Sequence, residues 1–318
     1  MQHKLIMLAG SAPGAGKSTL SEFLFDQFTR CFIPTHWIYE EDILHLDAFA
    51  SVVQAFQHGQ GDAIEALLAT TTRFVRDSMR SNVVVVTDSI FPAYTWLFAA
   101  GYPQARIADF SVQLAEVLSP LQPLTIYLNS DVATSLKRAV AQRGEPWLDD
   151  LIAAMETYTY CQTHQVRDMD DVIVFFESVT RLSIELLADW PHATLVLDTT
   201  AAPLDQIKAV LLQHLSLPQQ AAAPILTATE LQPYVGVYVP RDTTAALSSL
   251  EIRLIDGQLI INAYWPNGCR LIPDGPAQFR LQSTNRRVAF STQAKMRPGG
   301  LIYTYGGDAH HYDKIIKS

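Results

Sequence analysis

The sequence lacks the features that mark several protein classes. Its three cysteines are far apart and show no CxxC spacing, so neither a disulfide framework nor a cysteine zinc site is indicated. No block of Lys and Arg occurs and the formal net charge is −9, so we expect no nucleic-acid partner. No apolar run reaches the ~20 residues that cross a bilayer. We therefore expect a cytoplasmic protein with no membrane partner, and leave open whether it forms a homo-oligomer.

What is present indicates two folded domains. The 318 residues suffice for two domains of roughly 100–200 residues each, and 48% hydrophobic with 17% charged residues is ordinary for a globular protein. After His214 comes a stretch rich in Pro, Gln and Ala that has little to pack. We predict a first domain over 1–215, a linker over 216–228 and a second domain over 229–318.

The first domain alternates short apolar runs with helical patterns. Parallel strands need crossover connections, so this alternation predicts an α/β fold, a parallel sheet with helices on both faces. The strand candidates cover residues 5–9, 35–40, 83–87, 124–128 and 193–197. A long helical stretch over about 47–80 separates the second and third candidates.

The second domain has no helical periodicity. Turn signals such as Asp256-Gly257 and Asn267-Gly268 separate its short runs at hairpin distances. The pattern predicts an antiparallel sandwich or small barrel. The strand candidates cover residues 234–239, 250–255, 258–263, 270–272, 278–281, 287–291, 301–305 and 310–315.

A glycine-rich run between the first strand and the first helix has the composition of a phosphate-binding loop. In GxxxxGK[ST], backbone N–H groups and a helix N-terminus cradle phosphates, the Lys reaches the β- and γ-phosphates, and the hydroxyl binds magnesium. Lys17 and Ser18 hold the last two places, whereas Ser11 replaces the first Gly. The run predicts ATP and Mg²⁺ as cofactors, bound by Ala12, Pro13, Gly14, Ala15, Gly16, Lys17, Ser18 and Thr19.

This strand, loop and helix resemble the P-loop kinases of small molecules, the nucleoside, nucleotide and gluconate kinase superfamily, over about residues 1–215. The resemblance implies that Asp88, after the run Val83–Thr87, holds magnesium through water or touches the substrate. An aspartate that only caps the next helix is the alternative. It also implies that a loop at Thr199 and Thr200 lies beside the adenine.

The run Leu124–Asp131, with the basic residues that follow it, resembles the strand and lid of those kinases. There, Arg138 and Arg143 would close over the phosphates, with Lys137 on the same helix. Arginine suits this task because its fixed fork of donors matches phosphate oxygens. A solvated, salt-bridging helix face is the alternative for both arginines.

Phosphoryl transfer also needs a carboxylate that orients or deprotonates the acceptor hydroxyl. Ligands of parallel sheets bind at the carboxyl ends of the strands, and the second strand ends in Glu40-Glu41-Asp42. Asp42 is our preferred base, with Glu41 and Asp88 as rivals, whereas Glu40 is expected to be solvated. Asp47 is a weaker candidate.

The acceptor itself is not legible from the sequence. Arg73, Arg76 and Arg80 form one helical stripe that would suit an anionic acceptor, although a solvated face is the more usual use of such a stripe. Tyr94 belongs to an aromatic cluster that would wall a pocket or pack in the core. Ser89 follows Asp88 where deoxynucleoside kinases usually carry an arginine, which argues against close membership of that class.

The second domain resembles the small lipocalin-like barrels appended to some serine-hydrolase-like proteins, through Tyr234–Tyr238, Asp256–Leu259, Leu271–Pro273 and Phe279. The expected function of the chain is ATP-dependent phosphoryl transfer to a hydroxyl of a small molecule. The alternative is a nucleotide-binding switch whose β domain meets a partner or ligand.

Overall fold

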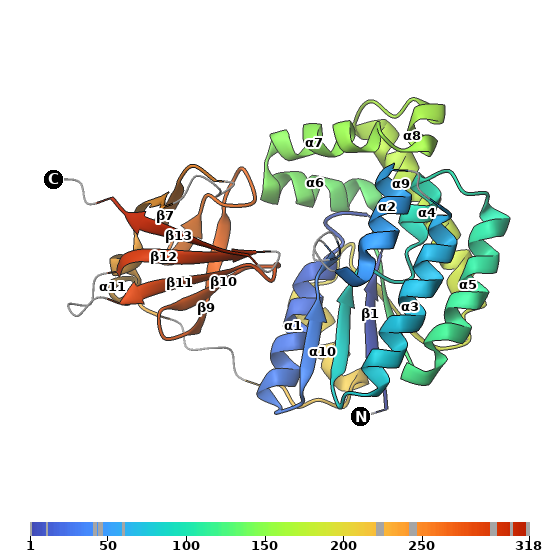
Figure 1. Ribbon diagram of the computed structural model, residues 1–318, viewed down its shortest axis with the longest axis horizontal. Coiled ribbons are helices and arrows are strands. Elements are labelled where there is room, and N and C mark those ends of the chain that lie inside the picture. Colours follow the sequence, from blue (N-terminus) through green and yellow to red (C-terminus); the bar gives the residue numbers. More distant parts are fainter. Residues whose placement is uncertain are drawn as a thin grey trace. The chain divides into compact units, whose positions relative to one another are not determined.

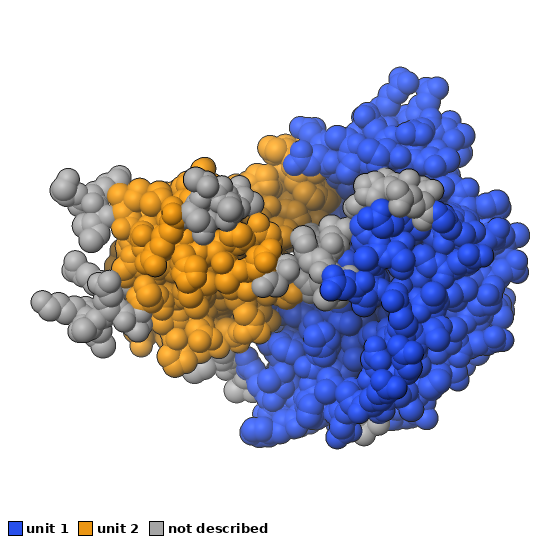
Figure 2. Space-filling view, viewed as in Figure 1, with its two compact units in different colours: residues 1–141, 148–220 blue, residues 142–147, 221–318 orange. Residues whose placement is uncertain are grey.

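A computed structural model shows the chain as two compact units (Figure 2). Unit 1 comprises Met1–Ala141 and Leu148–Gln220, and unit 2 comprises Gln142–Trp147 and Ala221–Ser318. The structure describes residues 2–10, 12–40, 43, 47–58, 61–220, 226–241, 247–292, 298–305 and 308–315. Three residues used in the sequence argument, Ser11, Glu41 and Asp42, lie outside these ranges.

Unit 1 contains a five-stranded sheet in the order β2-β3-β1-β4-β5, and all of its paired strands are parallel. Every strand is short and predominantly apolar, as parallel strands covered on both faces should be. The strands are β1 (Leu5–Ala9), β2 (Thr35–Ile38), β3 (Val84–Asp88), β4 (Leu124–Asn129) and β5 (Ala193–Asp198). The predicted parallel α/β fold is therefore confirmed.

Helices cover both faces of this sheet (Figure 1), and a hydrophobic core lies on each face. The alternate side chains of β1 divide between them: Ile6 and Leu8 pack against α1 and α10, whereas Leu5 and Met7 pack against α2–α5 and α9. The helices are α1 (Lys17–Arg30), α2 (Ala50–His58), α3 (Ala63–Met79), α4 (Tyr94–Ala99), α5 (Gln104–Leu118), α6 (Val132–Arg143), α7 (Glu145–Met155), α8 (Thr159–His164), α9 (Met169–Ala188) and α10 (Leu204–His214).

The central strand β1 differs from both of its neighbours in where its connection goes. The chain leaves β1 into α1 on one face, whereas the connections that follow β3 and β4 include α5 and α9 on the opposite face. Adjacent connections that part to opposite faces open a crevice at the carboxyl end of a parallel sheet, where ligands of such folds bind. The glycine-rich run follows β1 at this switch point.

Unit 2 contains a closed barrel of eight strands in the order β10-β11-β12-β13-β6-β7-β8-β9. Consecutive strands pair antiparallel, and β13 closes the barrel on β6. The strands are β6 (Gly236–Pro240), β7 (Leu250–Ile255), β8 (Gln258–Ile261), β9 (Cys269–Gly275), β10 (Gln278–Leu281), β11 (Arg287–Thr292), β12 (Pro298–Tyr305) and β13 (Asp308–Lys314). Each predicted strand overlaps one of these eight strands.

The turn between β7 and β8 forms where the sequence placed it. Asp256 has φ 48° and Gly257 has φ 74°, and Ile255 pairs with Gln258 across the turn. Positive φ at both central residues matches the right-handed twist of the flanking strands, which explains the Asp-Gly pair.

Aromatic rings fill much of the barrel interior. Phe279 is 1% exposed and lies 5.0 Å from Tyr234 and 5.5 Å from Phe290, measured between ring centroids. The hydroxyl of buried Tyr238 donates to the carbonyl of Tyr234 at 2.8 Å. The interior of an eight-stranded barrel is just wide enough for side chains to fill, and these rings form such a packed core.

Three features differ from the sequence prediction. The helical stretch expected over 47–80 begins with a short 3₁₀ turn, Asp47–Phe49, and continues as two helices, because Asp62 caps α3 and starts it anew. Residues 142–147, expected in the first domain, group with the barrel. The larger segment of unit 2 begins at Ala221, within the range expected as a linker. Among the described residues, no helix has the length and apolar content of a bilayer crossing.

Candidate functional site

The glycine-rich loop is anchored to both cores of unit 1 by its alanines. Ala12 is 3% exposed and joins one core, and Ala15, also 3% exposed, joins the other. Gly14, with φ 79°, lies against α6, where an added Cβ would be 2.0 Å from the Ser135 carbonyl oxygen. The loop therefore needs glycine at position 14 both for its backbone conformation and for its close approach to α6.

At the start of α1, the loop has open space on the side of Gly16 as far as the described residues extend. Gly16, in the left-handed conformation with φ 101°, is the N-cap of α1, and an added Cβ would meet no atom of the described residues within 4 Å. No side chain of the described residues caps this helix, and its first turn carries no acidic residue. Uncapped N–H groups and the positive end of the helix dipole form a site suited to an anion.

Lys17, Ser18 and Thr19 are the first three residues of α1, and all are half-buried. The Lys17 ammonium donates to the Ala12 carbonyl at 2.9 Å, so it lies back over the loop. Pro13 is half-buried beside Ala12. The loop residues Ala12–Gly16 and the first three residues of α1 therefore form one continuous segment directly after β1.

Asp88 ends β3 next to this loop. It pairs in register with Leu8, two residues before Gly10, and follows Val84 and Val86 on the sheet face that packs against α1. Its side chain is 1% exposed, and its Oδ1 accepts a hydrogen bond from the Ser89 hydroxyl at 3.1 Å. The register therefore puts a buried carboxylate on the α1 side of the sheet at its carboxyl edge.

The loops that follow β4 and β5 are joined by hydrogen bonds. The Thr199 N–H donates to Asn129 at 2.8 Å, and the Asp131 N–H donates to the Thr200 hydroxyl at 2.9 Å. Asp131 also caps α6 by accepting from the Thr134 N–H at 2.7 Å, and this bonding to Thr134 lowers the pKa of Asp131. The loop at Thr199 and Thr200 is therefore held in place by hydrogen bonds to the loop after β4.

Arg138 also holds the loop at Thr199 and Thr200. Its guanidinium donates to the carbonyls of Thr199, at 2.8 Å, and Thr200. The sequence assigned this arginine to the phosphates, whereas the structure uses it to tie α6 to the loop after β5. Its five fixed donors suit two adjacent carbonyls as well as they suit phosphate oxygens.

Arg143, the other lid arginine of the sequence argument, belongs to unit 2. Its guanidinium carbon lies 4.6 Å from the ring centroid of Trp147 and 4.3 Å from that of Trp265. Cation–π contacts of this kind hold a guanidinium against indole faces. The sequence spacing placed Arg143 at the end of α6, but it did not predict the contact between Arg143 and Trp265.

The burial of Glu40 was not predicted from the sequence. Glu40 was expected to be solvated, but it is half-buried at the end of β2 and accepts a hydrogen bond from the Trp96 indole at 3.3 Å. Burial, and then the Glu40 charge, raises the pKa of Tyr158. Glu40, Trp96 and Tyr158 are far apart in sequence, so no local pattern announces the cluster. The preferred base Asp42 and its rival Glu41 lie outside the described residues.

The residues assigned to an acceptor pocket have structural uses. Arg73 is exposed and donates to the Ala48 carbonyl at 3.1 Å, while Arg76 and Arg80 pair with Asp77 at 3.6 and 3.8 Å on the solvent side. The basic stripe is therefore a solvated helix face, as such stripes commonly are.

Tyr94, assigned to the wall of an acceptor pocket, is a core residue. It is 2% exposed and shares a hydrogen bond with Ser111 at 2.5 Å, and burial raises its pKa. Core packing, the alternative that the sequence left open for Tyr94, describes this setting.

The residues named for magnesium are Ser18 and Asp88. In the described part of the chain, no cluster of three or more His, Cys, Asp or Glu side chains forms a metal-binding group. Mg²⁺ differs from metals that need such a cage, because it usually keeps several waters and takes one or two protein oxygens plus substrate phosphates. A hydroxyl on the first turn of α1 and a buried carboxylate at the adjacent strand end fit that demand.

Comparison of this sequence with protein-family models and with curated proteins found no match. The inferences about the site therefore depend on the geometry of its own residues.

Proposed function

We propose that this chain is an ATP-dependent phosphotransferase that moves the γ-phosphoryl group of ATP to a hydroxyl of a small molecule. The observation that carries the proposal is the glycine-rich loop at the switch point of the parallel sheet, where Gly16 opens the uncapped start of α1. A triphosphate matches this place because several backbone N–H groups and Lys17 would share its charge.

In the reaction we envisage, the bond between the γ-phosphorus and its bridging oxygen breaks and a bond to the acceptor oxygen forms. The acceptor proton passes to a carboxylate, and ADP leaves with the bridging oxygen. Asp42 is the preferred candidate for that carboxylate, with Glu41 and Asp88 as rivals. Mg²⁺, when bound, would neutralise charge on the phosphate oxygens, with Ser18 and Asp88 as its protein partners.

The hydrogen-bonded loop at Thr199 and Thr200 is a second observation that supports nucleotide binding. Arg138 and Asp131 fix that loop, so it would not need to be ordered when a base packs against it. Preorganised contacts cost less conformational entropy on binding, which favours affinity.

The proposal is tested by measuring ADP release with ATP, Mg²⁺ and a panel of nucleosides, sugars, sugar acids and aminoglycosides. One acceptor class should stimulate release by at least about a hundredfold, and Lys17→Ala should remove that stimulation. Lys208→Ala on α10 is the matched control, because Lys208 lies against Phe23 and outside the loop. Full activity of Lys17→Ala would disprove the proposed mechanism.

A second candidate function is a nucleotide-dependent switch. The observation that favours it is that residues 142–147, directly after most of α6, belong to the same compact unit as the barrel. A change in α6 on nucleotide binding would then pass along the chain to the barrel unit. Slow ATP hydrolysis that no acceptor stimulates, together with a change in Trp265 fluorescence on ATP addition, would favour the switch over the kinase.

A further inference from the structure

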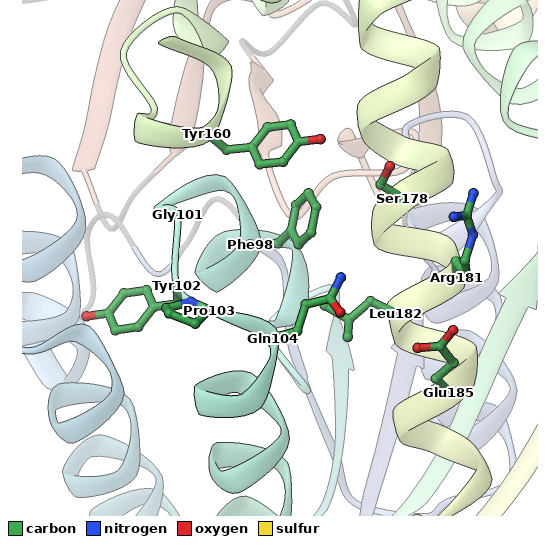
Figure 3. A pocket seen from close by; sticks show the side chains of 10 residues that line it. All are labelled: Phe98, Gly101, Tyr102, Pro103, Gln104, Tyr160, Ser178, Arg181, Leu182 and Glu185. Carbon is green, nitrogen blue, oxygen red and sulfur yellow. The ribbon is translucent and has the colours of Figure 1, made fainter. Parts of the chain in front are cut away.

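Unit 1 has a cavity that the phosphate loop does not explain. Its volume is about 540 Å³, within the range of about 300–1,000 Å³ typical of small-molecule sites. It lies between α8, α9 and the turn from α4 to α5 (Figure 3). The lining residues are Phe98, Gly101, Tyr102, Pro103, Gln104, Tyr160, Ser178, Arg181, Leu182 and Glu185. None belongs to the glycine-rich loop, α1 or β3.

One part of the cavity is aromatic and apolar. The Tyr160 ring reaches from α8 toward α9 and lies 4.5 Å from Phe98 between centroids (Figure 3). Phe98 is itself supported by Phe175 at 5.7 Å, and Leu182 is buried beside them. This floor is suited to an apolar or aromatic group, which would gain from leaving water and from ring contacts.

The rest of the cavity is polar: the hydroxyls of Ser178 and Tyr102 are bonded within the protein, whereas, among the described residues, four other polar side chains are not. In the part of the chain that the structure describes, no hydrogen bond or ion pair engages the Tyr160 hydroxyl, the Gln104 amide, the Arg181 guanidinium or the Glu185 carboxylate. Arg181 and Glu185 are one helical turn apart on α9 yet do not pair with each other. Both residues are exposed, so two opposite, solvent-accessible charges lie side by side on α9 at this cavity.

The N-terminus of α5 adds to this pattern. Its N-cap is Pro103, which has no side chain able to cap the helix, and its first turn carries no acidic residue. The partial positive charge there and the Arg181 guanidinium both favour a carboxylate in the ligand.

The balance of charge selects the ligand class. A phosphate or nucleotide would be opposed by Glu185, and a purely apolar ligand would leave both charges without use. An α-amino acid carries a carboxylate and an ammonium on one carbon, close enough together to meet side chains that are neighbours on a helix face. We propose that this cavity binds a free α-amino acid with an apolar or aromatic side chain, at a site separate from the phosphate loop.

The test uses the full chain, isothermal titration calorimetry and three matched probes. L-Phenylalanine has both charges, phenylacetate lacks the ammonium and phenethylamine lacks the carboxylate. L-Phenylalanine should bind at least about tenfold more tightly than either of the others. Arg181→Gln should weaken L-phenylalanine by about tenfold and leave phenethylamine unchanged, and Glu185→Gln should weaken L-phenylalanine and leave phenylacetate unchanged.

Glu177→Gln is the control, because it removes a charge from an exposed position of α9 that does not line the cavity. It should leave all three affinities unchanged. Lys17→Ala should also bind L-phenylalanine normally, so failure of this proposal and failure of the kinase proposal are distinguishable. No binding of L-phenylalanine or L-leucine at about 10 mM would overturn the proposal. Equal affinity for the three probes, or L-phenylalanine affinity unaffected by both substitutions on α9, would overturn it too.

Discussion

The carboxyl edge of the parallel sheet and the barrel use their residues in opposite ways. At the sheet edge, glycines hold the backbone in left-handed conformations and turn an uncapped helix start toward open space. In the barrel, the strands close on themselves and aromatic side chains fill the interior. Closure leaves no unpaired strand edge in the barrel, whereas the loop at the carboxyl end of β1 leaves the N–H groups at the start of α1 without a side-chain cap among the described residues.

The difference between the two regions indicates that ligand binding is to be tested at the carboxyl ends of the parallel strands and stability in the barrel. A packed aromatic interior contributes stability through buried area, whereas an exposed helix N-terminus contributes little stability and much ligand affinity. Substitutions in the two regions should therefore separate stability from nucleotide binding.

Phe279→Ala in the barrel should have the largest effect on stability and should leave nucleotide binding unchanged. Phe279 is 1% exposed among aromatic neighbours, so its removal should cost about 3–5 kcal/mol of the free energy of unfolding of the barrel. ATP affinity should not change. Thermal unfolding followed by near-ultraviolet circular dichroism, beside ATP titration, checks both points. Loss of ATP binding in a folded Phe279→Ala protein would show that the two regions do not act separately.

Two glycine substitutions in the loop should separate an effect on stability from an effect on ATP binding. Gly14→Ala puts a Cβ 2.0 Å from the Ser135 carbonyl oxygen, so it should destabilise unit 1 by about 2–4 kcal/mol. The Cβ of Gly16→Ala meets no atom of the described residues within 4 Å, so the substitution should cost only about 1–2 kcal/mol for its positive φ. Its Cβ would nevertheless enter the proposed phosphate space and weaken ATP binding by at least about tenfold.

Gly257→Ala in the barrel is the matched control for Gly16→Ala. It too has a positive φ, 74°, and open space around the added Cβ. It should show the same cost of about 1–2 kcal/mol with ATP affinity intact. Denaturant titration gives the free energies and calorimetry the affinities. If Gly16→Ala and Gly257→Ala leave ATP binding equally intact, the space at Gly16 is not the phosphate site.

The smallest effect concerns the start of α3. Asp62 caps this helix through the N–H groups of Ile64 and Glu65 and pairs with Arg106 at 3.0 Å. Partial burial opposes ionisation of Asp62, but these hydrogen bonds and the Arg106 charge outweigh it and lower the Asp62 pKa. Asp62→Ala should cost about 1 kcal/mol at neutral pH.

The sign of its pH dependence follows from that lowered pKa. The ionised carboxylate stabilises the folded state above the pKa of the unfolded chain, and this contribution is lost as the pH falls through the folded-state pKa. The stability difference between Asp62→Ala and the parent should therefore shrink in acid, as measured by denaturant titration over pH. Asp62→Asn, which keeps a capping oxygen, should lose mainly the pH-dependent part. A difference that does not change with pH would assign the effect to the cap geometry alone.

Local patterns in the sequence were sufficient for the elements and for the loop. The apolar run of β1, the Asp256-Gly257 turn and the positions of the eight barrel strands along the chain all depend on neighbours within a few residues, so periodicity and turn chemistry reveal them. The break before α3 was missed because the Asp62 cap was not recognised inside a long helical pattern.

The settings of individual side chains depended on contacts between distant segments. Arg138 was expected at the phosphates but binds the carbonyls of Thr199 and Thr200, 61 and 62 residues away. Glu40 was expected in solvent but meets Trp96, 56 residues away. Sequence spacing places a residue on a helix or at a strand end, but it does not say which partner the fold brings there.

Local periodicity and backbone preference in the sequence were enough to predict the parallel sheet, an antiparallel β domain and the glycine-rich loop between strand and helix, whereas the pattern alone left a sandwich or a barrel open. Only the tertiary structure decided that the space at Gly16 is open, that Asp88 is buried on the α1 side of the sheet, and that a charged cavity forms between α5 and α9. These features arise where segments far apart in the chain pack together, and local sequence carries no record of that packing.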